Sequence, residues 1–447
     1  MFRLGMFDPM DDQPLLNLGP ADVDNAAARA LALRTAQESI VLLKNTGGFL
    51  PLETPATTSF AFIGPLANAT QDLLSAPQYH GQNTLVNTHS PLQVARARGW
   101  KVAYAKGCNI CDIVPAGYPN MPCSGATPPA PDTSGIPAAV AAAKAADVAV
   151  LFLGADQTTE AENFDRRTLG LVGAQEQLLL AVAAANPRVV LVLINGGPID
   201  VASAVASTSV RAIIEAFQPG ELGGDAILDI LSGVVAPAGR MPYTTYFGNF
   251  TERDIRDVDL RSGSGTTYWW MQDPVLFPFG YGLSTTNFTF VWSDGPPPSA
   301  NSSAVLAQRL TVQLPAAGEV SSFSLQHTVV VTNTGTRASD VVVLAFAVAT
   351  AGSHSDMPLR RLFGFERLSM MAPGENRTVT FASDADSLGI VPRGSTAGVV
   401  QLVPGTVRIE CGGGGDGRSE LAAREYELVG DAVAVEENVW AGTVRPL

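Results

Sequence analysis

Short apolar runs alternate with helix-forming segments in the first half of this 447-residue chain, and no other feature constrains the fold as strongly. Three apolar runs of strand length lie at 148–153, 189–194 and 212–214, with Ala-rich segments around them. Strands that are apolar along their whole length belong to a parallel sheet that helices cover on both faces. The first half is therefore predicted to be an α/β sandwich domain with a mostly parallel sheet.

The same pattern extends toward the N-terminus. Residues 22–43 are predicted to form one helix, because apolar and small residues recur at helical spacing and Asp22 and Asp24 favour its start. Further strands are predicted at 59–64 and 101–104, and further helices at 136–146, 174–185 and 224–231. These elements complete a series of βαβ units.

Helical periodicity stops after about Ser284, and a different architecture begins. Residues 294–303 are rich in Gly, Pro and Ser, which is typical of a linker. From about Ser322, polar turns separate segments that alternate in the manner of strands, at 328–332, 341–346, 377–381 and 406–410. Short strands at this spacing predict a small all-β sandwich.

Charge and targeting signals exclude some partners. The net charge of −14 would repel phosphate backbones, so no nucleic-acid partner is expected. No apolar run is long enough for a membrane-spanning helix, and the first residues do not form a signal peptide. Five glycosylation sequons nevertheless indicate an extracellular, secreted glycoprotein: Asn68, Asn249, Asn287, Asn301 and Asn376.

The four cysteines are typical of a structural disulfide. Cys108, Cys111 and Cys123 cluster in a Pro/Gly-rich loop, and Cys411 lies far away in the sequence. A Cys-x-x-Cys pair can be redox-active or bind zinc, but no thioredoxin-like βαβ context or second ligand pair accompanies this one. One or two structural disulfides are predicted, with the pairing left open. No metal or cofactor is expected.

The loop that follows the strand at 148–153 is the first candidate site, since ligands of doubly wound sheets bind outside the carboxyl ends of the strands. It carries four carboxylates within ten positions: Asp156, Glu160, Glu162 and Asp165. Crowded carboxylates raise one another's pKa, which can keep a general acid protonated, and Arg166 and Arg167 can hold the others ionised. A merely solvated loop is the simpler interpretation. A calcium site is a further alternative, although the spacing does not match an EF-hand.

Two other motifs allow a functional and a structural interpretation. The run Asn195-Gly-Gly-Pro follows a strand end, where it can line a site or only make the turn. The run Tyr268-Trp-Trp can stack on sugar rings or pack in a core.

Several motifs in a fixed order give the chain its resemblance to a known family. They are Arg3-Leu-Gly-Met-Phe-Asp-Pro, Glu38-Ser-Ile-Val-Leu-Leu-Lys-Asn, Asp156-Gln-Thr-Thr-Glu-Ala-Glu-Asn-Phe-Asp-Arg, Asn195-Gly-Gly-Pro-Ile-Asp, Phe277-Pro-Phe-Gly-Tyr-Gly-Leu-Ser and Leu362-Phe-Gly-Phe-Glu-Arg-Leu. Together they resemble glycoside hydrolase family 3, in its plant and fungal β-xylosidase branch. The last motif resembles the fibronectin type III-like module of that branch.

The resemblance implies a retaining exo-β-glycosidase. In such enzymes an Asp on a (β/α)8 barrel attacks the anomeric carbon, and a Glu from the α/β sandwich protonates the leaving oxygen. This implies that Glu160 or Glu162 is the acid/base, with Glu160 favoured as the first Glu of the pair. Tyr79 and Gly81 match a segment that approaches the substrate, although Gln78 replaces the Asn of the family pattern.

The resemblance also implies a division of the chain. The expected parts are a lead-in from a barrel domain (1–21), the α/β sandwich with an aromatic extension (22–284), a linker (285–321), a fibronectin type III-like domain (322–412) and a tail (413–447). The barrel, a partner domain of the full-length enzyme, is expected before Arg3, so this chain alone is expected to be inactive. Xylan-derived oligosaccharides are the expected substrate. An α-L-arabinofuranosidase, a β-glucosidase and a non-catalytic carbohydrate-binding or structural remnant remain alternatives.

Overall fold

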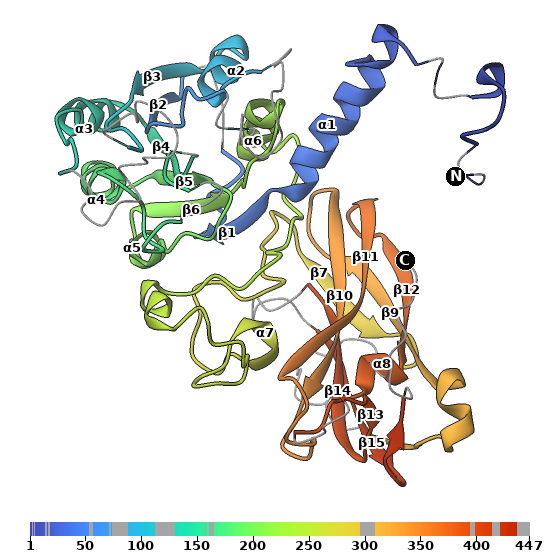
Figure 1. The fold of residues 1–447 in the computed structure, drawn as a ribbon. Helices are drawn as coiled ribbons and strands as arrows, with labels where there is room; N and C mark the ends of the chain where they lie inside the picture. The colour runs from blue at the N-terminus through green and yellow to red at the C-terminus, as the bar shows by residue number, and fades with distance from the viewer. Residues whose placement is uncertain are drawn as a thin grey trace.

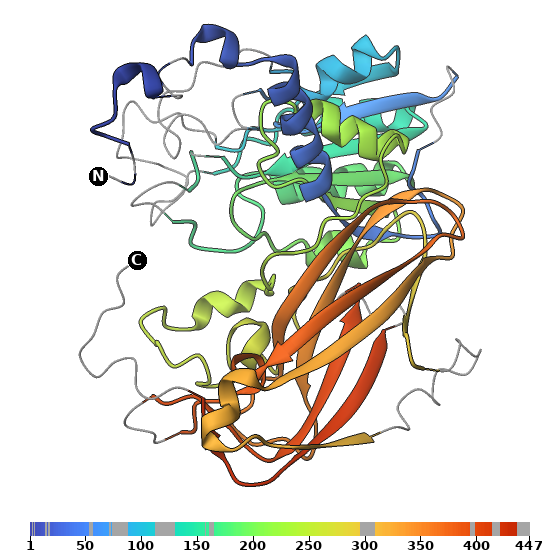
Figure 2. The same ribbon diagram turned by 90° about the vertical axis from the view of Figure 1, so that its right-hand side faces the viewer.

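The structure is a computed structural model with two layered bodies, an α/β sandwich and a β-sandwich, joined by an extended segment (Figures 1 and 2). It describes the whole chain except residues 2, 4, 14–15, 17, 53–56, 71–72, 74–87, 112–129, 157, 161–164, 296–308, 394–397, 414–420 and 436–447. No described helix is long and apolar enough to cross a membrane.

The first body is built on a six-stranded sheet with the order β1-β6-β5-β4-β2-β3. Its strands are β1 (Val41–Asn45), β2 (Ser59–Ile63), β3 (Lys101–Ala105), β4 (Val148–Gly154), β5 (Val189–Ile194) and β6 (Val210–Glu215). All neighbouring strands are parallel except β1, which runs antiparallel to β6. The central strands β4 and β5 are buried along their whole length. The prediction of a mostly parallel, fully covered sheet is confirmed.

Helices cover both faces of this sheet. One face carries α1 (Ala26–Ser39), α2 (Pro91–Ala97) and α6 (Gly223–Ser232), and the other carries α3 (Ile136–Ala145), α4 (Gln175–Ala185) and α5 (Ala202–Ala206). Successive residues of β4 point to opposite faces, so Val150 packs in one apolar cluster and Leu151 in the other. The sheet is thus the shared centre of two apolar layers.

The predicted helix over 22–43 is wrong at its C-terminal end. The Asn25 side chain accepts a hydrogen bond from the Ala28 amide and caps α1, which ends at Ser39. The next residues form β1, where fully buried Val41 and Leu42 pair with β6. A short apolar run does not by itself distinguish strand from helix, and pairing with the sheet edge decides the outcome here.

The second body consists of two facing antiparallel sheets, with the orders β11-β10-β14-β15-β8 and β12-β9-β7, the first containing one parallel pair, β15 with β8. Their strands are β7 (Phe288–Trp292), β8 (Arg309–Gln313), β9 (Ser324–Asn333), β10 (Ser339–Ala349), β11 (Arg360–Met371), β12 (Asn376–Asp384), β14 (Gly405–Gly412) and β15 (Ala422–Val429). A short pair, β13 (Gln401–Leu402) with β16 (Val433–Ala434), and helix α8 (Ala385–Leu388) complete it. The predicted all-β sandwich is confirmed.

The β-sandwich includes segments that the sequence analysis assigned to a linker and a tail. Strands β7 and β8 lie within 285–321, and β15 lies within 413–447. Phe290 and Trp292 of β7 and Tyr426 of β15 are buried in the sandwich core. Strand β7 has only five residues and pairs with β9, more than thirty residues further along the chain, so local patterns do not reveal it. Strand β15 pairs with β14 across a Gly-rich segment, which resembles a tail in the sequence.

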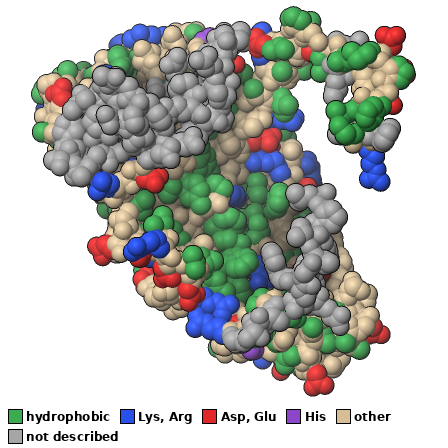
Figure 3. Space-filling model, viewed as in Figure 1, with side chains coloured by type: hydrophobic (Ala, Val, Ile, Leu, Met, Phe, Trp, Pro, Cys, Tyr) green, Lys and Arg blue, Asp and Glu red, His purple; other side chains and the backbone are tan. Residues whose placement is uncertain are grey.

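The aromatic extension, which the expected division of the chain assigns to the α/β sandwich, packs against both bodies. The Tyr281 hydroxyl donates to the Leu43 carbonyl of the α/β sandwich at 2.9 Å. Tyr268 of α7 (Thr267–Trp270) instead stacks on Phe279, with ring centroids 4.2 Å apart, and both contact Phe346 of β10. Hydrophobic side chains gather in the hollow between the bodies (Figure 3), so the extension joins two apolar surfaces.

Candidate active site

The loop that carries Glu160 leaves the sheet at Gly154, the last residue of β4. A Cβ atom at this position would lie 1.8 Å from the Ile194 carbonyl oxygen of β5, so only glycine fits. The buried Gln175 side chain accepts from the Gly154 amide and donates to its carbonyl, each at 2.8 Å. The start of the loop is therefore held beside the carboxyl end of β5.

The first carboxylate of the loop serves its local structure. Asp156 Oδ1 accepts hydrogen bonds from the Thr158 amide, at 2.9 Å, and from the Thr158 hydroxyl. The Glu160 amide donates to the Asp156 carbonyl at 3.2 Å and closes the turn. Burial raises the pKa of the Asp156 carboxyl above its ordinary value. This residue therefore shapes the turn that presents Glu160.

Glu160 ties this loop to the turn that follows β5. Its Oε2 lies 2.6 Å from Arg166 Nε, and its Oε1 accepts from the Gly197 amide at 3.1 Å. Arg166 Nη2 also donates to the Pro198 carbonyl at 2.9 Å. The Arg166 side chain is 7% exposed and that of Glu160 is 23% exposed, so Glu160 is the more accessible member of the pair.

The turn that follows β5 is held in place by the end of β6. Asn195 is fully buried, and its Nδ2 donates to the Gly197 carbonyl at 2.9 Å and, more weakly, to Glu215 Oε2 at 3.5 Å. Glu215 Oε1 accepts from the Phe217 amide at 3.0 Å. Burial raises the pKa of Glu215 from its ordinary value of 4.5 to about 8. The carboxyl ends of β4, β5 and β6 thus form one connected polar cluster.

The sequence analysis singled out part of this cluster and missed part. Glu160 and the Asn195 turn were both candidates, and the structure brings them together. Arg166 pairs with a carboxylate of the loop, Glu160, as predicted, whereas the Asp165 side chain is exposed. Glu215 was missed, although a Glu that ends an apolar strand was an available signal. Three predicted residues, Glu162, Tyr79 and Gly81, lie outside the described residues.

The other candidate motifs have structural contacts. The Trp269 ring lies under the Arg361 guanidinium at 4.9 Å, and the Trp270 ring lies under Arg261 at 4.1 Å, so one face of each indole is covered by a cation. Cys111 is disulfide-bonded, as predicted for the cysteine cluster. Within the part of the chain that the structure describes, no three His, Cys, Asp or Glu side chains gather as metal ligands.

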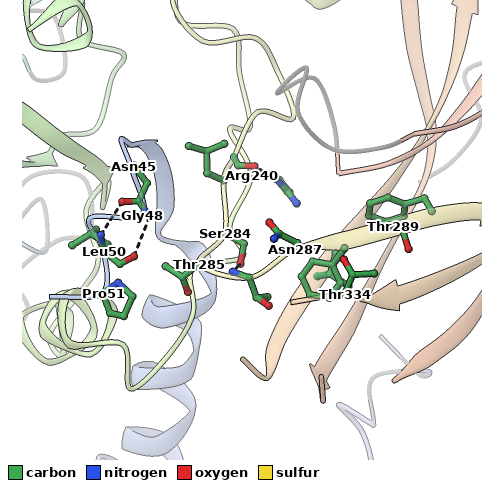
Figure 4. A pocket seen from close by; sticks show the side chains of 16 residues that line it. Asn45, Gly48, Leu50, Pro51, Arg240, Ser284, Thr285, Asn287, Thr289 and Thr334 are labelled. Atoms are coloured by element: carbon green, nitrogen blue, oxygen red, sulfur yellow. Dashed lines mark hydrogen bonds between the residues drawn. The ribbon is translucent and has the colours of Figure 1, made fainter. Parts of the chain in front are cut away.

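A separate cavity of about 580 Å³ lies where the two bodies meet (Figure 4). Asn45 and Leu50 line it from the α/β sandwich, and Asn287 and Thr334 from the β-sandwich. The Asn45 side chain accepts from the Leu50 amide at 2.8 Å and donates to its carbonyl at 3.1 Å. No described residue of the 154–166 loop lines this cavity, so it is distinct from the Glu160 cluster.

Comparison with known proteins identifies the family of the chain. The glycosyl hydrolase family 3 C-terminal domain matches residues 40–285, more than half of the chain. The chain belongs to glycoside hydrolase family 3. A fibronectin type III-like domain matches residues 341–414 within the β-sandwich. Family and fold both agree with the resemblance identified from the sequence motifs.

Relatives of this family 3 chain include fungal enzymes. A probable exo-1,4-β-xylosidase of Aspergillus fumigatus is 37% identical over 417 residues, which cover 92% of this chain and 49% of the relative. An exo-1,4-β-xylosidase of Emericella nidulans is 34% identical over 444 residues, which cover 98% of this chain and 53% of the relative. The chain therefore spans about half the length of the curated relatives that it matches.

Solved structures of family 3 enzymes share the fold. The exo-β-xylosidase XlnD, in complex with a xylobiose aziridine probe, matches with a TM-score of 0.78 at 28% identity, over 96% of this chain and 52% of that chain. A family 3 β-glucosidase of Bifidobacterium adolescentis matches with a TM-score of 0.69 at 27% identity, over 97% of this chain and 56% of that chain. Both matches extend over the two bodies.

Proposed function

We propose that this chain is the C-terminal part of a retaining exo-1,4-β-xylosidase and that Glu160 is its general acid/base. The observation that carries the proposal is the Glu160 carboxylate itself, partly exposed at the carboxyl edge of the sheet and held by Arg166 and Gly197. In the proposed enzyme a (β/α)8 barrel supplies the nucleophilic Asp. Retaining glycosidases place the two carboxyl groups about 5–5.5 Å apart.

The two steps of a double displacement make different demands on Glu160. In the first step it gives a proton to the leaving oxygen, and in the second it takes a proton from the attacking water. Both present contacts of Glu160 come from donors, Arg166 Nε and the Gly197 amide. We therefore propose that a bound glycoside replaces at least one of these contacts before protonation.

Exposed apolar residues support a partner domain on this chain. Large apolar side chains of the N-terminal segment are between 56% and 73% exposed: Met6, Phe7, Met10, Leu16, Leu18 and Val23. A cluster of this kind on one segment is typical of a surface that another domain covers. We propose that the barrel domain covers it in the full-length enzyme.

The proposed substrates are xylo-oligosaccharides, in keeping with the names of the relatives that are 37% and 34% identical. β-Glucosidase activity is the second candidate, because a β-glucosidase structure also matches, at 27% identity. Rates on aryl β-xyloside and aryl β-glucoside, measured with a chimaera that joins this chain to the barrel of the Aspergillus fumigatus relative, distinguish the two. An extracellular location is part of the proposal, supported by the exposed side chains of Asn68, Asn249, Asn287 and Asn376.

The same chimaera tests the acid/base assignment. Glu160→Ala is expected to slow hydrolysis of xylobiose by roughly 10²–10⁴-fold, the usual contribution of general acid catalysis. An aryl xyloside with an activated leaving group is expected to suffer less in the first step. Azide is expected to restore its turnover, because azide attacks the glycosyl-enzyme without a base.

Glu162→Ala is the matched variant from the same loop. Azide rescue of Glu162→Ala without rescue of Glu160→Ala would reverse the two roles. Rescue of neither variant would sink the proposal that this loop supplies the acid/base.

A further inference from the structure

A continuous series of contacts leads from Glu160 to a second, fully buried carboxyl group. Glu160 Oε1 accepts from the Gly197 amide, and the Gly197 carbonyl accepts from Asn195 Nδ2. The same Nδ2 lies 3.5 Å from Glu215 Oε2, and the backbone amide of Asn195 donates to the Phe217 carbonyl at 3.1 Å. Glu215 is 3% exposed, so it cannot itself meet a substrate.

Hydrogen-bonding capacity is left over around this series. Three buried polar atoms have no hydrogen-bond partner among the described residues: Arg166 Nη1, Asn195 Oδ1 and the Tyr243 hydroxyl. Buried polar groups in folded proteins are nearly always bonded, so three exceptions in one cluster require an explanation. Surplus donors and acceptors let the cluster change its hydrogen bonds without losing packing. The side-chain amide of Asn195 contacts both Gly197 and Glu215.

We propose that Glu215 is a positioning residue, which acts through Asn195 on the 195–198 turn and so fixes the Gly197 amide and the Pro198 carbonyl that hold the Glu160–Arg166 pair. This inference rests on the proposed function for the role of Glu160. The contacts that carry it are those of the chain as it stands.

The protonation state of Glu215 connects the position of Glu160 to pH. With its pKa raised to about 8, Glu215 is neutral in acid and becomes charged in weak alkali. Tyr243, from the segment after α6, interacts electrostatically with Glu215 and also with Arg166 and Glu160 of the β4 loop, so these three are the other titratable and charged groups of the cluster. When Glu215 ionises, its negative charge attracts the side-chain amide of Asn195 and the Arg166 guanidinium and repels the Glu160 carboxylate. The turn and the ion pair are therefore expected to shift together as Glu215 ionises.

The test follows Gly197 and Glu160 by NMR in the 447-residue chain. The Gly197 amide shift and the Glu160 side-chain carboxyl carbon shift are expected to share a transition with a midpoint near pH 8. Glu215→Gln is expected to abolish that transition, because glutamine keeps the shape and cannot ionise. Glu215→Leu is expected to accelerate hydrogen exchange of the Gly197 amide by roughly tenfold or more, since the support for the turn is lost.

Asp229→Asn is the matched control. Asp229 is also a buried carboxyl group of this domain, but it lies on α6, on the other face of the sheet. It accepts hydrogen bonds from Arg98 and Gln37. It is expected to leave both signals and the exchange rate unchanged. The proposal is overturned if the transition persists in Glu215→Gln, or if Asp229→Asn abolishes it too. Should Glu215→Leu not fold, Glu215→Gln decides alone. Absence of azide rescue in both Glu160→Ala and Glu162→Ala would remove the proposed acid/base function of the loop and leave this coupling standing.

Discussion

The buried ring of His327 in the β-sandwich and the side chains of Asn195 and Tyr243 in the α/β sandwich differ in whether their buried polar atoms all have hydrogen-bond partners. In the β-sandwich, His327 Nε2 lies 2.7 Å from the Ser383 hydroxyl, and its Nδ1 lies 3.2 Å from the Tyr426 hydroxyl. In the α/β sandwich, Asn195 Oδ1 and the Tyr243 hydroxyl have no partner among the described residues. A closed group stabilises one packing arrangement, whereas an open group keeps capacity for a ligand, water or another domain.

The location of the two groups agrees with this difference. His327 is 1% exposed inside a core between two sheets, far in sequence from any loop of the candidate site. The open group lies at the carboxyl edge of the parallel sheet, where α/β proteins bind their ligands. Buried polar residues alone therefore do not identify a site, but unmet hydrogen bonds at a sheet edge do favour one.

The largest expected effect is the complete loss of activity when no partner domain accompanies the open group. The 447-residue chain alone is expected to release no xylose from an aryl β-xyloside, because the described residues form no barrel that could carry a nucleophile. The chimaera with the relative's barrel is the positive control. Activity of the chain alone that Glu160→Gln abolishes would show that the open group is already complete.

The two groups are also expected to give opposite pH dependences. Burial lowers the pKa of His327 from 6.5 to about 4, so the unfolded chain binds more protons in this range and stability falls as pH decreases through it. The pKa of Glu215 is raised to about 8, so the folded chain retains a proton that the unfolded chain loses, and stability falls as pH rises from about 4.5 to about 8. The two contributions oppose each other between about pH 4.5 and 6.5, and Glu215 alone lowers stability from there to about pH 8. Urea unfolding between pH 4 and 9 measures their sum.

Glu215→Gln separates these two contributions. It is expected to remove the fall in stability above about pH 6.5, by an amount on the order of a few kcal/mol, and to uncover the rise in stability with pH that His327 contributes below about pH 6.5. An unchanged fall in stability in this variant would mean that Glu215 is already ionised in the folded chain at neutral pH.

A pair of tyrosine variants gives the smallest expected effects and the sharpest contrast. Tyr426→Phe removes a partner of buried His327 and is expected to lower the free energy of unfolding by about 1–3 kcal/mol. Tyr243→Phe removes a hydroxyl without a partner and is expected to change it by less than about 1 kcal/mol. Urea unfolding at pH 7 measures both, and equal losses would contradict the distinction between closed and open groups.

The sequence pattern predicted the elements whose signal is local. The runs that became β4 and β5 are apolar throughout, and the structure buries every residue in them. Strands β1 and β7 escaped prediction, because a short apolar run acquires its identity from the strand beside it. The extension around Tyr268 was assigned to one body only. Its contact with Phe346 could not be predicted, because Phe346 lies more than sixty residues away in the sequence.

By itself the sequence determined the order of the two architectures, the family resemblance and the position of Glu160 in the loop after a parallel strand. These follow from periodicity and contiguous motifs, which can be read from consecutive residues of the sequence. Only the tertiary structure decided that Arg166 and Gly197 hold Glu160 and that Asn195 connects their turn to Glu215. The physical reason is that a parallel sheet brings the ends of β4, β5 and β6 to one edge, although Glu160 and Glu215 are 55 positions apart in the chain.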